Sequence, residues 1–342
     1  MNFQTKVIIL IVGLILFSIA ILTIICSIYF FYALTRKGLT KMKKKILTFK
    51  NIPSPESFKD FIDSNWYKNH NASKLHITSY DNLKLSGIFV RNTKPSKNIV
   101  ILSHGYTASS SAMLCYTSYY YNKGFNILAV DNRCHGESQG KYLGMGYLDH
   151  FDILKWIDKC KELLGNDCKI ILHGVSMGAA TVCITAGYNP PKNVKCIISD
   201  CAYDRISDVY KQTITSSTKI LATPIIKGTS LICKLMAGYY FSEAAPINFV
   251  SKTPVPILYI HGDKDTFVPS YMADNLFNAT PPDKRDILLI KGAGHGEAVI
   301  KDNQTYFNKI QEEIKGKERI LSRYGMAIEK MKDTENLVKM LE

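Results

Sequence analysis

The sequence lacks ionisable side chains in one long stretch near its start. Residues 7–34 contain no Lys, Arg, His, Asp or Glu, although the 342-residue chain carries 43 basic and 29 acidic residues. A bilayer core requires roughly 20 apolar residues in one helix, whereas the apolar part of a secretory signal has only about 7–15. No small-residue cleavage site precedes the next basic cluster. The stretch therefore predicts an uncleaved transmembrane anchor; the alternative is a buried core helix.

Acidic residues are absent from residues 1–50, which hold eight Lys and Arg. The formal net charge is +14, which leaves +6 for the rest of the chain. A basic balance confined to one end favours a membrane surface over nucleic acid as the partner. Most of these cations follow the uncharged stretch, so the positive-inside rule predicts a single-pass protein of the cell membrane whose main domain faces the cytoplasm.

The nine cysteines include no C-x-x-C pair, and their spacing is irregular. Cys183, Cys196 and Cys233 lie in apolar runs. This pattern is typical of reduced thiols that pack as small hydrophobic side chains. It predicts neither a disulfide framework nor a metal site, and we expect no cofactor.

The part of the chain after residue 73 alternates between two kinds of pattern. Two segments of alternating hydrophobicity flank Asp81-Asn82 and predict a β-hairpin. Short apolar runs then alternate with helix-period stretches such as 149–164, where Phe151, Leu154, Ile157, Cys160 and Leu164 share one side. This predicts an α/β fold with a mostly parallel sheet flanked by helices and a ligand site at the carboxyl ends of the strands. The expected strands are 98–105, 125–131, 169–174, 194–200, 256–262 and 286–292.

Ser176 stands in the sequence Gly174-Val175-Ser176-Met177-Gly178, between an expected strand and a helix-like run of small residues. A G-x-S-x-G match is weak alone, but this strand-to-helix context predicts a sharp turn with the serine at its corner. The flanking residues must be small because the backbone is crowded there. The turn would lift the hydroxyl above the sheet at a helix N-terminus, where free N–H groups stabilise an oxyanion.

A serine nucleophile needs a base and a group that orients the base. In this architecture the chain order is serine, acid, histidine. His295 lies in a glycine-rich loop after an expected strand and is the predicted base; the alternative is a surface loop histidine. Asp263 and Asp265 both follow the preceding strand. We choose Asp265 because Asp263 sits against the strand end as a turn residue, and Asp200 is the reserve candidate.

An oxyanion hole needs two N–H donors. Met177, directly after the serine, supplies one, and Tyr106 in the loop "SHGYTAS" is the predicted second. The tyrosine side chain could also wall an acyl pocket. We expect His104 in the same loop to be structural rather than catalytic.

Six segments resemble the α/β-hydrolase superfamily, in particular its serine aminopeptidase and monoacylglycerol-lipase-like group and the bacterial members with an N-terminal membrane anchor. They occur in order within residues 75–314 and read "SHGYTAS", "DNRCHGESQG", "HGVSMGAA", "SDCAYD", "HGDKDTFVP" and "GAGHGEA". The resemblance implies an α/β-hydrolase fold with a catalytic triad of Ser176, Asp265 and His295. Cys134 departs from the family, which usually has glycine there, and Arg133 and His135 beside it are expected to tie loops together.

We expect four segments along the chain. They are a transmembrane anchor (1–35), a basic linker (36–73), an α/β-hydrolase domain (74–314) and a helical C-terminal extension (315–342), to which we assign no chemistry. Residues 205–250 lie between two expected strands, break the regular alternation of strands and helices, and are rich in apolar side chains. They predict a small helical cap that covers the site and supplies the substrate pocket; ordinary packing helices are the alternative.

These observations predict a membrane-anchored serine hydrolase that cleaves carboxylic esters, of the esterase, lipase or thioesterase type. Its expected partners are a small-molecule ester or acyl substrate and the lipid bilayer, not nucleic acid. An apolar cap beside a membrane favours acyl chains over peptides. The alternatives are a serine aminopeptidase-like peptidase, for which Glu243 is the only evident partner of a substrate amine, and a non-catalytic binding module.

Overall fold

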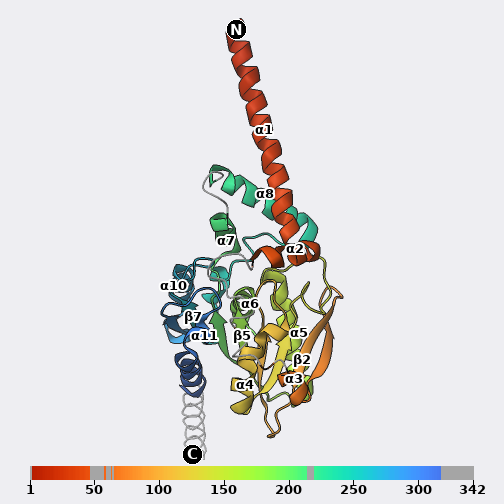
Figure 1. The fold of residues 1–342 in the computed structure, drawn as a ribbon, viewed down its shortest axis with the longest axis vertical. Helices are drawn as coiled ribbons and strands as arrows, with labels where there is room; N and C mark the ends of the chain where they lie inside the picture. Colours follow the sequence, from red (N-terminus) through yellow and green to blue (C-terminus); the bar gives the residue numbers. More distant parts are fainter. Residues whose placement is uncertain (1, 47–57, 59–62, 64, 214–218, 317–342) are drawn as a thin grey trace, which may run out of the picture.

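The structure is a computed structural model that describes residues 2–46, 58, 63, 65–213 and 219–316. Almost all of the predicted C-terminal extension, 315–342, and much of the predicted linker, 36–73, lie outside the described residues. Helix α1 projects from one end of an α/β domain, and helices lie on both sides of its sheet (Figure 1).

The domain is built on one eight-stranded sheet with the strand order β1-β2-β4-β3-β5-β6-β7-β8. Strand β2 is antiparallel to β1 and β4, and every other neighbouring pair is parallel. The expected hairpin and the mostly parallel sheet are thus confirmed. The strands are β1 (Ser73–Thr78), β2 (Lys84–Val90), β3 (Asn98–Ser103), β4 (Asn126–Val130), β5 (Lys169–Val175), β6 (Val194–Asp200), β7 (Ile257–Gly262) and β8 (Arg285–Ile290).

Each face of the sheet has its own apolar core, because successive side chains of a strand point to opposite faces. In β3, Ile99 and Ile101 belong to one core, and Val100 and Leu102 belong to the other. Burial on both faces explains why the strands read as continuous apolar runs. The first core packs against α5 (Tyr147–Leu164), α6 (Met177–Gly187) and α10 (Tyr271–Ala279), and the second against α4 (Leu114–Asn122), α11 (Ala298–Lys301) and a helix at 303–316.

Residues 205–250 contain three helices and, among their described residues, no strand. These are α7 (Ile206–Thr213), α8 (Lys219–Ala237) and α9 (Ile247–Val250). They contribute to a third apolar cluster that lies outside the two cores of the sheet. This cluster joins residues of the insert to α1 and α6, and it includes Phe31, Met177, Ile206, Ile226 and Phe241.

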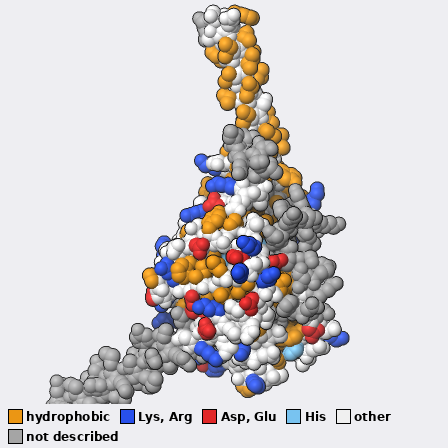
Figure 2. All heavy atoms as spheres, turned by 60° about the vertical axis from the view of Figure 1, so that its left-hand side comes forward, with side chains coloured by type: hydrophobic (Ala, Val, Ile, Leu, Met, Phe, Trp, Pro, Cys, Tyr) orange, Lys and Arg blue, Asp and Glu red, His pale blue; other side chains and the backbone are white. Residues whose placement is uncertain are grey.

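Helix α1 (Phe3–Ala33) has an exposed apolar part and a docked part. Side chains from Phe3 to Leu22 are exposed, and Figure 2 shows hydrophobic side chains along the projecting helix. Further along, Ser27 is buried against α8: its hydroxyl donates to the Ile225 carbonyl oxygen (3.0 Å), and the Thr229 hydroxyl donates to the Ser27 carbonyl oxygen (3.3 Å). Gly228 permits this approach, because a Cβ there would lie 2.4 Å from the Ser27 Oγ.

The end of α1 is part of the folded domain. Leu34, just after the helix, is 1% exposed, and its carbonyl oxygen accepts from the Leu143 N–H (2.9 Å). The Arg36 N–H donates to the Lys141 carbonyl oxygen (3.0 Å) at the start of α2 (Arg36–Ile46). A deletion ending at residue 35 would therefore remove buried residues as well as the apolar helix.

Arg133 joins its loop to the turn between β1 and β2, as the sequence predicts, and also to helix α5. Its side chain is 2% exposed; its Nε donates to Asp152 Oδ2 (2.8 Å), and its Nη1 donates to Asp81 Oδ2 (3.0 Å). The neighbouring residue, Cys134, has a φ of +68°, a conformation that favours the glycine usual in the family.

Arg133→Gln should lower the free energy of unfolding by about 3 kcal/mol, because it leaves the buried Asp152 carboxylate without its partner. Denaturant unfolding of the full-length protein in detergent measures this change. Lys74→Gln is the matched control, since the Lys74–Glu137 pair (2.7 Å) is exposed and should contribute little. Equal, small effects of the two substitutions would contradict the structural role of Arg133.

Candidate active site

Ser176 occupies a strained corner between β5 and α6. Its backbone has φ +55° and ψ −113°, which costs a non-glycine residue on the order of 1–3 kcal/mol. A Cβ at Gly178 would lie 2.0 Å from the Ser103 carbonyl oxygen, and one at Gly174 would lie 2.1 Å from the Gly178 carbonyl oxygen. The glycines on both sides of the serine are therefore required by contact with neighbouring backbone, as the sequence pattern predicts.

A continuous chain of hydrogen bonds joins Ser176, His295 and Asp265. The distance between Ser176 Oγ and His295 Nε2 is 2.8 Å, and that between His295 Nδ1 and Asp265 Oδ2 is 2.7 Å. The three residues follow β5, β7 and β8, whose carboxyl ends share one edge of the sheet. The structure thus brings together the three residues that the sequence singles out.

The environment of Asp265 fixes the direction of this hydrogen-bond chain. Burial alone would raise the pKa of Asp265, but the charges and hydrogen bonds of His295 and His261 outweigh it and lower the pKa below its usual value. The carboxylate also accepts from the N–H groups of Phe267 (2.9 Å) and Val268 (2.8 Å). An ionised carboxylate only accepts, so His295 carries its proton on Nδ1 and leaves Nε2 to accept the Ser176 proton.

The two other acids that the sequence offered are engaged elsewhere. Asp263 Oδ1 accepts from the Gly292 N–H (2.6 Å), as expected of a turn residue. Asp200 accepts from two buried tyrosine hydroxyls at 2.8 and 3.4 Å, and burial raises its pKa to about 6. Neither carboxylate is hydrogen-bonded to His295, so the geometry favours Asp265.

The two expected oxyanion donors lie beside the serine. Met177 is the first residue of α6, where a helix leaves its N–H without an internal partner. Gly105 packs against Ser176, because a Cβ at Gly105 would lie 3.3 Å from the Ser176 Cβ; Tyr106 follows it. In the part of the chain that the structure describes, the N–H groups of Tyr106 and Met177 have no hydrogen-bond acceptor.

His104, in the same loop, has a structural environment. Its Nε2 accepts from the Asn132 N–H (3.1 Å), and its Nδ1 donates to the Gly105 carbonyl oxygen (2.7 Å). Burial lowers its pKa to about 4, so the ring stays neutral at physiological pH. Both nitrogens are occupied, which agrees with the expected structural role.

One contact of the site has no signal in the sequence. The Tyr106 hydroxyl donates to the carbonyl oxygen of Ala33, the last residue of α1, at 2.9 Å. The two residues are 73 positions apart, and neither lies in a motif that pairs them. The loop beside Ser176 is therefore fastened directly to the end of the N-terminal helix.

The surroundings of the serine are closed and mainly apolar. Ser176 is 9% exposed and His295 is 7% exposed, with the Phe267 ring 5.0 Å from the imidazole. Met177 and Tyr106 also belong to, or pack against, the third apolar cluster. Within the described residues, no group of three or more His, Cys, Asp or Glu side chains has the arrangement of a metal site.

The sheet order and the order of these residues define a class of protein. A nucleophile elbow after β5, an acid after β7 and a histidine after β8, on a mostly parallel sheet, are the features of an α/β-hydrolase. The chain therefore has the α/β-hydrolase fold.

Comparisons with known proteins agree with this fold. Residues 94–231 match the family model described as serine aminopeptidase, S33. The Bacillus subtilis protein YqkD is 26% identical over 215 residues, 63% of this chain and 70% of that protein. The Saccharomyces cerevisiae membrane protein YNL320W is 21% identical over 234 residues, which are 67% of this chain and 75% of the yeast protein. The Pyrococcus furiosus esterase Pf2001 is similar in structure, with a TM-score of 0.59 and 24% identity over 73% of this chain and 94% of its own.

Asp265→Asn should slow the labelling of Ser176 by a fluorophosphonate probe at least 100-fold. The neutral amide no longer holds the His295 proton on Nδ1, and the base loses its orientation. Asp263→Asn is the matched control, because that carboxylate accepts only from a turn N–H, and its labelling rate should stay near that of the wild type. The reverse ranking would assign the acid to Asp263, and damage from Asp200→Asn alone would assign it to Asp200.

Proposed function

We propose that the protein is a membrane-anchored serine hydrolase that cleaves carboxylic esters, of the esterase, lipase or thioesterase type. The observation that carries the proposal is the Ser176–His295–Asp265 hydrogen-bond chain at a strained strand-to-helix corner. A binding module would have no use for a strained serine hydrogen-bonded to an oriented histidine.

The first half of the reaction forms an acyl-enzyme. His295 Nε2 takes the hydroxyl proton while Ser176 Oγ bonds to the carbonyl carbon of the ester. The carbonyl oxygen becomes an oxyanion, which the N–H groups of Met177 and Tyr106 stabilise. The intermediate collapses when the carbon–oxygen bond to the alcohol breaks, and His295 gives its proton to the leaving oxygen.

The second half hydrolyses the acyl-enzyme by the same groups. His295 Nε2 takes a proton from a water molecule, and the water oxygen bonds to the acyl carbon. The bond to Ser176 Oγ then breaks, and the serine recovers its proton from the imidazolium. Throughout, the Asp265 carboxylate stabilises the positive charge on His295 and remains ionised, in keeping with its lowered pKa.

The surroundings of Ser176 support an ester with an apolar acyl group. The third apolar cluster adjoins Met177 and Tyr106, and a neighbour in fold is an esterase. An aminopeptidase needs a free carboxylate for the substrate amine, but Glu243 accepts from the Tyr240 N–H (2.7 Å) and pairs with Lys234 (3.3 Å). The description of the matching family model keeps a serine aminopeptidase as the second candidate.

Helix α1 supports a membrane anchor. It is long and apolar enough to cross a bilayer, and its most apolar 18-residue window has no buried residue. A relative from yeast is described as a membrane protein. Lys37 and Lys41 are exposed on the domain side of the helix, so we propose that the hydrolase domain faces the cytoplasm.

Ser176→Ala should lower kcat for a p-nitrophenyl ester of short or medium chain by roughly 10⁴-fold or more, because triad members act as a unit. The assay uses the full-length protein in detergent, so that the docked end of α1 is kept. Ser118→Ala, an exposed serine on α4, is the control and should keep wild-type activity. Full activity of Ser176→Ala would rule out the serine mechanism.

The protein should stay in the membrane fraction after washing with high salt or alkaline carbonate, and detergent alone should release it. A spanning helix is held by apolar burial, whereas salt screens a purely electrostatic attachment. Release by salt would contradict the anchor. Separately, protease added to intact cells should spare the domain; cleavage would place it on the outer side and leave the serine mechanism unaffected.

A further inference from the structure

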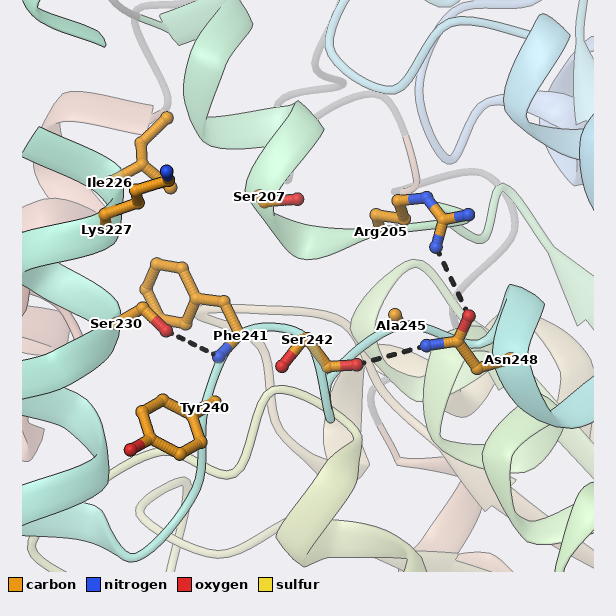
Figure 3. A pocket seen from close by; sticks show the side chains of 10 residues that line it. All are labelled: Arg205, Ser207, Ile226, Lys227, Ser230, Tyr240, Phe241, Ser242, Ala245 and Asn248. Carbon is orange, nitrogen blue, oxygen red and sulfur yellow. Dashed lines mark hydrogen bonds between the residues drawn. The ribbon is translucent and has the colours of Figure 1, made fainter. Parts of the chain in front are cut away.

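A pocket of about 410 Å³ lies between α7, α8 and the segment that leads to α9. Figure 3 shows Arg205 and Lys227 at its two ends, with Ser207, Ser230 and Ser242 between them and Tyr240 beneath. None of the lining residues belongs to the Ser176–His295–Asp265 chain. Its volume is within the usual range of ligand pockets, about 300–1,000 Å³.

The lining of the pocket is cationic and rich in hydroxyl groups. It includes Arg205 and Lys227 but no carboxylate. Among the described residues neither cation has a salt-bridge partner, and the Arg205 guanidinium donates only to the Asn248 side-chain oxygen (3.3 Å). The Ser230 Oγ accepts from the Phe241 N–H (3.0 Å), so its own O–H proton is left to donate. Two cations and several hydroxyl donors around one cavity suit a phosphate group.

Three acids are next in sequence to lining residues, and each is engaged by another group. Glu243 accepts from the Tyr240 N–H (2.7 Å) and pairs with Lys234 (3.3 Å). Asp208 on α7 pairs with Lys211 at 2.9 Å. Asp204 is 3% exposed and accepts from the Asn275 side chain at 2.7 Å. None of these carboxylates forms an ion pair with Arg205 or Lys227 among the described residues, although the charge of Asp204 interacts with that of Arg205.

Helix α8 is a common wall between the pocket and the anchor. Lys227 and Ser230 line the pocket, whereas Gly228 and Thr229 contact Ser27 of α1. A helix with its side chains is about 10–12 Å across. The pocket therefore lies about one helix diameter from α1, at the level of Ser27.

The length of α1 indicates where Ser27 would lie relative to the bilayer. With 1.5 Å per residue, residues 7–26 span about 30 Å, the thickness of a hydrocarbon core. Ser27, where burial against α8 begins, then lies at the boundary of the hydrocarbon. The exposed apolar side chains Leu231, Leu235 and Met236 of α8 are 52%, 76% and 50% exposed and suit contact with lipid near that boundary.

We propose that this pocket binds the phosphate of an anionic phospholipid headgroup, with Arg205 and Lys227 as its cationic partners. The inference rests on the proposed membrane anchoring but not on the serine chemistry. A lipid is favoured over a soluble phosphate because the pocket lies at headgroup depth, next to exposed apolar side chains and the apolar ring of Phe241. A bound headgroup would hold α8 against the membrane surface.

The test measures lipid retention by native mass spectrometry of the full-length protein in non-ionic detergent. The Ser176→Ala background prevents hydrolysis of the lipid. Phosphatidylglycerol is the probe, and phosphatidylcholine is the comparison lipid. We expect a preference for phosphatidylglycerol that falls at least tenfold in Arg205→Gln/Lys227→Gln, since each charge-assisted contact contributes strongly to binding. Lys227→Arg should retain the preference.

The control is Lys192→Gln/Lys252→Gln, which removes two exposed positive charges outside the pocket and should retain the wild-type preference. Equal retention of the two lipids by the wild-type pocket, or equal losses in the pocket and control variants, would overturn the proposal. Glycerol 3-phosphate serves as the soluble competitor. If it binds as tightly as the lipid and depends on the same two residues, the pocket binds a soluble phosphate and the assignment to a lipid is wrong. The carbonate wash tests the anchor separately, so a failure of anchoring and a failure of headgroup binding are distinguishable.

Discussion

The close approach of α6 to β3 is the contact on which the site depends. Gly178 packs its Cα against the Ser103 carbonyl oxygen, where a Cβ would come within 2.0 Å. This contact forces the chain to turn sharply after β5 and leaves Ser176 at a positive φ. The folded protein keeps this strained conformation because the tightly packed sheet and helices around the turn leave it no other.

A second constraint joins this site to the N-terminal helix. The Tyr106 hydroxyl holds the Ala33 carbonyl oxygen, while the Tyr106 N–H is the proposed oxyanion donor. The same residue thus contacts the end of α1 through its side chain and directly follows Gly105, which packs against Ser176. The end of the helix and the loop beside the serine form one structural unit, and α1 contributes to the site besides its proposed role as an anchor.

The sequence predicted the features that depend on local chemistry. The strand-ending residues, the elbow and the order of Ser176, Asp265 and His295 follow from short motifs with a direct steric or chemical reason. The buried face of α5 was predicted less well. The predicted stripe includes Phe151 and Leu154, which are only partly buried, whereas Ile153 and Trp156, which it omits, are each 1% exposed. The reason is that α5 also buries polar residues beside the Arg133 ion pair, so hydrophobic periodicity alone places its face slightly wrongly.

The contacts of α1 could not be predicted because they join residues that are far apart in the chain. Ser27 meets Ile225 across 198 positions, and Ala33 meets Tyr106 across 73. In the sequence nothing distinguishes Ser27 from Ser18 and Thr23, the other small hydroxyl residues of the same apolar stretch. Only the small residue Gly228 is compatible with a close approach of two helices, and a single glycine in an apolar run is just as compatible with a turn or a helix end.

If α1 is the membrane anchor proposed above, these contacts determine which end of the domain faces the membrane. The end of α1 binds the loop after β3 through Tyr106 and the loop after β4 through Lys141 and Leu143, and both loops follow the carboxyl ends of their strands. Ser176 lies at that same edge of the sheet, and Figure 1 shows α1, α7 and α8 gathered there. With α1 in the bilayer, as proposed, this edge would face the membrane, and the third apolar cluster would lie close to both, because it contains Phe31 near the end of α1 and Met177 beside Ser176. For the proposed hydrolase, this arrangement would favour an ester whose acyl chain lies in the bilayer over a soluble peptide.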